Sequence, residues 1–277
     1  MTDRFEAHLR DAEPEFRELL GRIPLLATPP LPGDWLRWEM LERHEVLSRA
    51  PIRAGTTILE VGSGPHAIAT VPLAYAAGPS ARVVAVERSR WDHFRTVVGR
   101  SGLGDRIGPV RGDARRLPLS GDSVSLAVCL HGIRSLHGEE GTVRVIREMF
   151  RVAPYVFLAE SLPLARNGAQ RAHLAMYDLR EEVFSAAGGG CDDLHYAPLD
   201  RLAALVERAG GVVERSEVLE VDLPHFLAYF PRARVEAVPA GEHREDLLRR
   251  WDEADVLRRR DGEDHPPVGV VTASRAQ

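Results

Sequence analysis

The residues best suited to chemistry lie in the stretch ILEVGSGPHA, where a carboxylate and two glycines end a short aliphatic run. Gly62 and Gly64 begin a G-x-G-x-x-A pattern. Glycines at such a turn let a ligand approach the backbone, and the next helix offers free N–H groups. Glu87 ends the following aliphatic run, where such sites bind the hydroxyls of a ribose. The pattern predicts a site for an adenosine-containing ligand.

Two carboxylates near this turn help to distinguish the possible ligands. Glu60 lies two residues before Gly62, where it would repel a pyrophosphate and attract a cationic amino or sulfonium group. Asp113, in RGDARRLPL, can accept a hydrogen bond from an exocyclic amine such as adenine N6. We therefore place a nicotinamide dehydrogenase below a nucleoside-binding protein among the alternatives.

From about residue 56 to 160 these motifs resemble, in order, those of the class I S-adenosylmethionine-dependent methyltransferases. The similar elements are EVGSG (60–64), the acidic residue 87, GDA (112–114) and LAVCLHGI (126–133). The resemblance implies S-adenosylmethionine as cofactor and S-adenosylhomocysteine as product. It also implies these contacts: Glu60, Gly62, Ser63 and Gly64 with the methionine part, Glu87 and Arg88 at the ribose, Asp113 and Ala114 at the adenine, and Leu130 and His131 near the amino group and the methyl donor.

Aliphatic runs and amphipathic segments alternate from residue 56 onward, which indicates a parallel sheet with crossover helices. Strands are predicted at 56–61, 82–87, 107–112, 123–130, 155–160, 212–221 and 267–274. Helices are predicted at 66–78, 89–100 (opened by Ser89), 139–152, 167–184, 198–211 and 243–259.

The resemblance implies how these elements are arranged. It implies an α/β fold of Rossmann-like, doubly wound type, with a seven-stranded, mostly parallel sheet in the order 3-2-1-4-5-7-6 and helices on both faces. Residues 51–277 would form this domain, and the helical residues 1–50 a cap over the cofactor cleft. Residues 161–197 would be an insertion that covers the substrate, because ligands of open α/β sheets bind at the carboxyl ends of the strands.

Methyl transfer from a sulfonium is an in-line displacement that needs positioning and, for some acceptors, a base. His131 directly follows the fourth predicted strand, beside the expected methyl position, and is our candidate for a catalytic base. Contact with the cofactor, or simple packing, is the alternative. Glu160, at the end of the fifth predicted strand, is either a substrate anchor or a capping carboxylate.

The sequence lacks the motifs of several methyltransferase subclasses. No [DN]-P-P-[YF] element follows the fourth predicted strand, Cys129 lies inside that strand rather than in a Pro-Cys motif, and HPPV (265–268) is far away in the sequence. We see no carboxylate cluster for a metal at the cleft. The prediction is a metal-independent enzyme that methylates O, N or C of a small molecule. The alternatives are an RNA or protein methyltransferase and a non-catalytic S-adenosylmethionine-binding protein.

Other polar and aromatic residues have plainer interpretations. We expect Trp35 and Trp38 to be core contacts between a helix and the sheet. Five residues that might face the cleft are expected on the surface instead: His137, His173, Tyr177, Asp178 and His195.

The composition of the chain limits the partners and the cellular compartment that we expect. The chain has 277 residues, a formal net charge of −5 and no lysine, which disfavours wholesale binding to nucleic acids or membranes. Its two cysteines form no CxxC pair, and no run of 18 apolar residues or signal peptide is apparent, so we expect a cytoplasmic protein. Oligomeric state is not predicted.

Overall fold

The computed structural model describes residues 2–26, 33–88, 91–136, 138–186, 196–225 and 229–276. Within them the chain forms a seven-stranded sheet in the order β3-β2-β1-β4-β5-β7-β6, with β7 antiparallel to both of its neighbours. The predicted topology is therefore confirmed. The strands are β1 (Thr57–Val61), β2 (Arg82–Glu87), β3 (Ile107–Arg111), β4 (Leu126–Leu130), β5 (Tyr155–Ser161), β6 (Gly211–Leu219) and β7 (Val268–Arg275).

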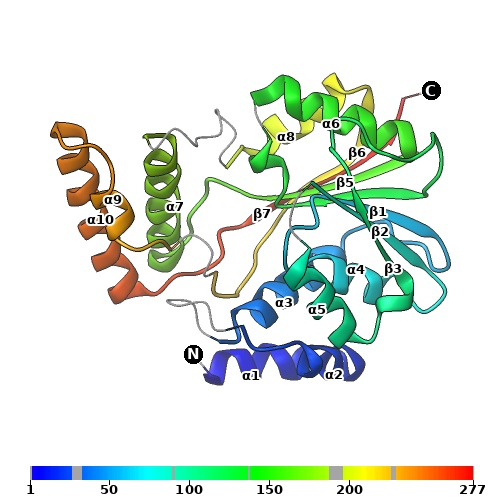
Figure 1. The fold of residues 1–277 in the computed structure, drawn as a ribbon, viewed down its shortest axis with the longest axis horizontal. Helices are drawn as coiled ribbons and strands as arrows, with labels where there is room; N and C mark the ends of the chain where they lie inside the picture. The colour runs from blue at the N-terminus through cyan, green and yellow to red at the C-terminus, as the bar shows by residue number, and fades with distance from the viewer. Residues whose placement is uncertain are drawn as a thin grey trace.

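Helices cover both faces of the sheet (Figure 1). On one face lie α3 (Trp35–Leu47), α4 (Thr70–Ala76) and α5 (Asp92–Ser101), and on the other α6 (Gly138–Val152) and α8 (Leu199–Arg208). Successive strand residues point to opposite faces. In β1, Ile58 belongs to the core under α3 and α4, whereas Leu59 and Val61 belong to the core under α6 and α8.

The N-terminal helices α1 (Thr2–Asp11) and α2 (Pro14–Arg22) lie outside α3 and α5 (Figure 1). Phe16 of α2 stacks on His44 of α3 at a ring-centroid distance of 4.0 Å and also contacts Tyr75 of α4. Of this N-terminal segment, α3 reaches the carboxyl ends of the strands. That residues 1–50 form a cap over the cofactor cleft stays a prediction.

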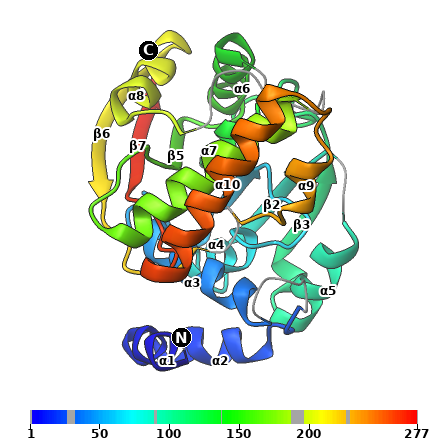
Figure 2. The same cartoon turned by 90° about the vertical axis from the view of Figure 1, so that its left-hand side faces the viewer.

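Three further helices, α7 (Gly168–Ala186), α9 (Ala233–Glu236) and α10 (Glu242–Asp261), lie beyond the carboxyl end of β5 (Figure 1). They occur there because α7 follows β5, while α10 precedes the antiparallel β7. Figure 2 shows α7 and α10 packed side by side. Their buried side chains, Trp251 among them, form a hydrophobic cluster separate from the two clusters under the sheet.

Several predicted elements have different bounds. The helix predicted at 89–100 begins at Asp92 with Trp91 as its N-cap, and Ser89 lies outside the described residues. The helix predicted at 198–211 ends at Arg208. The helix predicted at 66–78 begins at Thr70, because Ala67 has a left-handed φ of 52°, which an α-helix does not contain. The strand predicted at 123–130 begins at Leu126. Two 3-10 turns, η1 (Gly104–Arg106) and η2 (Ile133–Ser135), precede β3 and follow β4. Among the helices that the structure describes, none has the length and apolar character to cross a bilayer.

Candidate functional site

A cavity of about 330 Å³ opens at the carboxyl ends of β1, β2 and β4. This is the edge at which open α/β sheets bind their ligands. Of the residues predicted to bind a cofactor, those that line the cavity are Gly62, Gly64, Glu87, Arg88, Asp113, Ala114 and His131. We call this cavity, where the sequence predicts that a cofactor binds, the cofactor pocket.

The glycine turn between β1 and α4 forms one wall of the cofactor pocket. Gly62 and Gly64 have left-handed φ angles of 77° and 65°, which only glycine adopts readily. A Cβ added at either glycine would meet no atom within 4 Å, so the backbone faces open space there. The Gly64 N–H donates to Glu87 Oε2 at 3.2 Å, which joins the turn to the end of β2.

Glu60, Ser63 and Leu130 do not line the cofactor pocket but are buried behind it. Glu60 shares its strand face with Ile58, toward α3 and α4, and Glu60 Oε2 has no hydrogen-bond partner among the described residues. Burial is the main reason that the pKa of Glu60 rises to about 7. A buried carboxylate oxygen without a partner fits a site that is completed by a cationic ligand.

Asp113 lies at the opposite wall and is held by its neighbour. The Arg115 guanidinium donates to both carboxylate oxygens, at 3.1 Å and 2.7 Å, and the Arg115 N–H donates at 2.9 Å. These hydrogen bonds lower the pKa of Asp113 to about 2, so that it stays an ionised acceptor. This fits the predicted contact with an exocyclic amine.

His131 has an unusual backbone for its residue type. Its φ is 51°, a left-handed conformation that costs about 1–2 kcal/mol for a residue with a Cβ. The His131 N–H donates to the Ala159 carbonyl at 2.8 Å. The ring is 3.1 Å from Glu42 through Nε2 and 3.2 Å from the Ser161 hydroxyl through Nδ1. The surroundings therefore fix both backbone and ring.

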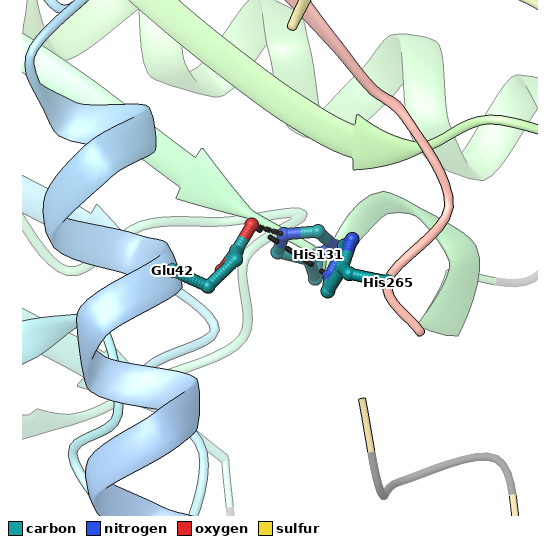
Figure 3. Close-up of side chains that lie close together, drawn as sticks. All are labelled: Glu42, His131 and His265. Carbon is teal, nitrogen blue, oxygen red and sulfur yellow. Dashed lines mark hydrogen bonds and ion pairs between the residues drawn. The ribbon is translucent and has the colours of Figure 1, made fainter. Parts of the chain in front are cut away.

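A group of ionisable side chains surrounds this ring on the side away from the cofactor pocket. Glu42 Oε1 lies 3.1 Å from His131 Nε2 and 3.7 Å from His265 Nε2 (Figure 3). Arg43 pairs with Glu42 and, at 3.4 Å, with Glu39. His225 Nδ1 donates to Glu39 at 2.7 Å. We call these residues the buried polar cluster: Glu39, Glu42, Arg43, His131, His225 and His265, all with 7% or less of their surface exposed.

Burial lowers the pKa of each histidine in the buried polar cluster, and neighbouring positive charges add to the effect. Burial lowers the pKa of His131, and the positive charges of Arg43 and Arg134 lower it further. Burial also lowers the pKa of His225 and of His265. Their rings therefore offer lone pairs rather than positive charge near neutral pH.

From the sequence we did not predict most of this cluster, and we expected no cluster of carboxylates at the cleft. The structure adds two carboxylates of α3 that do not line the pocket: Glu42 contacts His131, and Glu39 contacts His225. A local signal for it exists in the sequence. Glu39 and Arg43 continue the helical stripe of Leu36, so they fall on a buried face. No comparable signal marks His225 or His265, which lie outside helices and strands.

Glu160 has the capping role that was one of its two interpretations. Its Oε1 accepts the Ile133 N–H at 2.6 Å and the Arg134 N–H at 3.4 Å, which fixes η2 directly after His131. Its Oε2 is buried without a hydrogen-bond partner among the described residues. Cys129 lies inside β4 as expected, and burial raises the pKa of its thiol.

The surface interpretation is wrong for His173 and Tyr177, which have 0% and 3% of their surface exposed. They lie on the inner face of α7, where His173 Nε2 is 2.9 Å from the Tyr196 hydroxyl and its ring stacks on His225. Asp178 is exposed, as expected. The core interpretation of Trp35 and Trp38 is confirmed, and His137 and His195 lie outside the described residues.

Solved structures share this architecture at low sequence identity. A cyclopropane-fatty-acyl-phospholipid synthase-like protein from Lactobacillus casei superimposes with a TM-score of 0.71 and 13% identity, covering 95% of this chain and 100% of its own. A SAM-dependent methyltransferase from Aquifex aeolicus gives 0.52 and 16%, covering 86% and 91%. The mitomycin 7-O-methyltransferase MmcR gives 0.54 and 19%, covering 88% and 57%. No protein-family model and no curated protein matches the chain.

The chain has the class I S-adenosylmethionine-dependent methyltransferase fold. Within this class I fold, the cofactor pocket lies at the carboxyl ends of β1, β2 and β4, and the buried polar cluster adjoins it through His131. Since folds of this size host many activities, the reaction has to be argued from the site.

Proposed function

We propose that the protein is an S-adenosylmethionine-dependent methyltransferase that acts on a small molecule. The observation that carries this proposal is the pocket itself, which has an open glycine turn and Glu87 at the end of β2, with the buried Glu60 carboxylate behind the turn. Oε2 of Glu60 has no hydrogen-bond partner among the described residues. These groups suit, respectively, the close approach of a ligand, two ribose hydroxyls and an ammonium group.

Each remaining contact of the proposed cofactor has a candidate residue in the pocket. Asp113 and Ala114 would bind the adenine, and Arg88, which also lines the pocket, would be a further contact of the cofactor. Bound S-adenosylmethionine supplies an activated methyl group, which passes to the acceptor as the carbon–sulfur electron pair returns to sulfur. The acceptor loses a proton where its nucleophilic atom carries one.

The acceptor is proposed to be a small molecule, attacked at O, N or C. The pocket adjoins a buried cluster of neutral histidines and paired charges, which suits a small acceptor. Exposed Arg88 and Arg115 also line the pocket, so salt-dependent binding of RNA would favour the RNA methyltransferase alternative instead. The fold neighbour MmcR is named for methylating an oxygen of mitomycin. His131 as a base stays a prediction, and both of its ring nitrogens already have partners, Glu42 and Ser161.

Calorimetric titration with S-adenosylhomocysteine tests the cofactor. We expect one molecule bound per chain and no comparable binding of NAD. Glu87→Gln should weaken binding by about tenfold or more, because a charged hydrogen-bond acceptor contributes about 1.5–3 kcal/mol. Glu207→Gln, which changes an exposed carboxylate on α8, should leave the affinity unchanged. Tighter binding of NAD, or no binding of the nucleoside, would contradict the proposal.

A further inference from the structure

Three side chains of the buried polar cluster come from distant parts of the sequence and meet at one point. Glu42 lies on α3, His131 directly follows β4, and His265 precedes β7. One donor atom from each lies within 4.8 Å of the other two, and all three residues are buried (Figure 3). Two imidazole nitrogens and one carboxylate oxygen form a donor set that binds divalent first-row transition metals.

The two distances from Glu42 to the histidines suit ligands of a single ion. Glu42 Oε1 is 3.1 Å from His131 Nε2 and 3.7 Å from His265 Nε2. Neighbouring ligands have such separations when each is bound to one metal at about 2.0–2.2 Å.

Hydrogen-bond accounting leaves one ring nitrogen of His265 without a partner. His265 Nδ1 is 2.7 Å from the Pro266 carbonyl, which can only accept, so Nδ1 carries a proton. Nε2 faces Glu42 Oε1 at 3.7 Å, which is too long for a hydrogen bond. His265 Nε2 is buried and has no hydrogen-bond partner among the described residues. A cation between Nε2 and this carboxylate oxygen would satisfy both.

Each of the three side chains is also held from behind by a second partner. Arg43 contacts Glu42 Oε2, which leaves Oε1 for the two histidines. The Ser161 hydroxyl lies 3.2 Å from His131 Nδ1 and can accept its proton when Nε2 is a ligand. Pro266 fixes the tautomer of His265. Metal-ligating side chains are oriented by outer partners of this kind.

The charges around the three donors tolerate a cation. Within the buried polar cluster two carboxylates, Glu39 and Glu42, share the one guanidinium of Arg43, so one negative charge remains to attract a cation. Three protein ligands leave coordination positions open, as at metal sites that bind a water or a substrate.

From this geometry we infer that Glu42, His131 and His265 bind one divalent transition-metal ion of the zinc, cobalt or iron(II) class beside the cofactor pocket. This revises the expectation of a metal-independent protein, which rested on seeing no carboxylate cluster at the cleft. The inference does not depend on methyl transfer, because it concerns binding of the ion alone.

Metal titration of the purified chain, first stripped with a chelator, tests the site. Calorimetry should detect one Zn²⁺ per chain, with no comparable binding of Mg²⁺, since imidazole ligands favour transition metals. Co²⁺ should give visible absorption bands that Zn²⁺ abolishes by displacement. His265→Gln and Glu42→Gln should each weaken Zn²⁺ binding by about tenfold or more.

His173→Gln is the matched control, because His173 is equally buried and contacts the same His225 but is outside the donor set. It should keep full Zn²⁺ affinity. Thermal melts verify that each variant is folded, and the two ligand variants serve as alternatives if one does not fold. Folded wild-type chain that binds neither Zn²⁺ nor Co²⁺, or binding unaffected by both ligand substitutions, overturns the inference. S-adenosylhomocysteine titrations of the same samples report the proposed function separately.

Discussion

His131 engages a separate partner with each of its three nitrogen atoms. Its backbone N–H donates to Ala159, Nδ1 contacts Ser161, and Nε2 contacts Glu42. These contacts compensate for its left-handed backbone, since strained residues persist only where surrounding structure fixes them. The conformation turns the ring away from the line of β4 and toward α3.

Glu60 should make cofactor binding depend on pH. Its pKa of about 7 reflects burial first, which raises it; Thr70 lowers it, Glu87 raises it and Arg43 lowers it. Below this pKa Glu60 is protonated, whereas an ammonium ligand favours the ionised form. The affinity for S-adenosylhomocysteine should therefore rise with pH between about 5 and 7, by up to about tenfold per unit, and level off above. Calorimetry at several pH values measures the slope.

Proton release provides the control for Glu60. At pH 6, binding to the wild type should release a proton, which appears as a dependence of the binding heat on the ionisation enthalpy of the buffer. Glu60→Gln should remove both the release and the slope. An unchanged slope in Glu60→Gln would assign the titration to another group.

Some site residues can be predicted from the local sequence, and others cannot. Glu60, Gly62, Glu87 and Asp113 belong to local motifs whose spacing follows from a strand, a turn and a helix. By contrast, Glu42 and His131 are 89 positions apart. Their contact depends on where α3 packs against the end of β4, and nothing in either local sequence encodes that packing.

At the scale of elements, a substitution in the turn between β1 and α4 should lower both the stability of the fold and the affinity for the ligand, and the two effects can be measured separately. Gly62→Ala should destabilise the chain by about 1–2 kcal/mol, because φ is positive there. The added Cβ would also project into the open space where the ligand is proposed to contact the backbone. S-adenosylhomocysteine should therefore bind at least about tenfold more weakly. Denaturant unfolding and calorimetry measure the two effects.

Gly78→Ala is the matched substitution. Gly78 follows α4, has a φ of 81°, meets no atom within 4 Å of its would-be Cβ and does not line the cofactor pocket. It should lose comparable stability and keep full affinity. Equal loss of affinity in both variants would mean that strain alone, transmitted through the fold, weakens the site.

Most element types follow from the sequence because aliphatic runs and amphipathic stripes differ in period. The short helix α4 shows the limit of that signal. The residues 66–69 suit a helix by composition, but the turn requires a left-handed Ala67, and the need to form the pocket overrides the local preference.

At the scale of the whole molecule, the separate hydrophobic clusters predict that α7, α9 and α10 can open locally while the sheet stays folded. Trp251 packs between α10 and α7, and its indole N–H donates to the Phe230 carbonyl at 3.2 Å. Trp251→Ala should cost about 3 kcal/mol or more. Because this cluster is separate from those under the sheet, hydrogen exchange should accelerate in α7, α9 and α10 while β1, β4 and β5 keep their protection.

Val256→Ala, on the exposed side of α10, provides the comparison, since 63% of that side chain is exposed and the change should alter stability by less than about 0.5 kcal/mol. Faster exchange throughout the sheet in Trp251→Ala would show that the helices and the sheet unfold as one unit.

His131 lines the cofactor pocket, and its ring is one of the three donors of the proposed metal site. A metal ion and a nucleoside bound at the two places would therefore be thermodynamically linked through one residue. By whatever factor zinc alters the dissociation constant of the nucleoside, the nucleoside must alter that of zinc by the same factor.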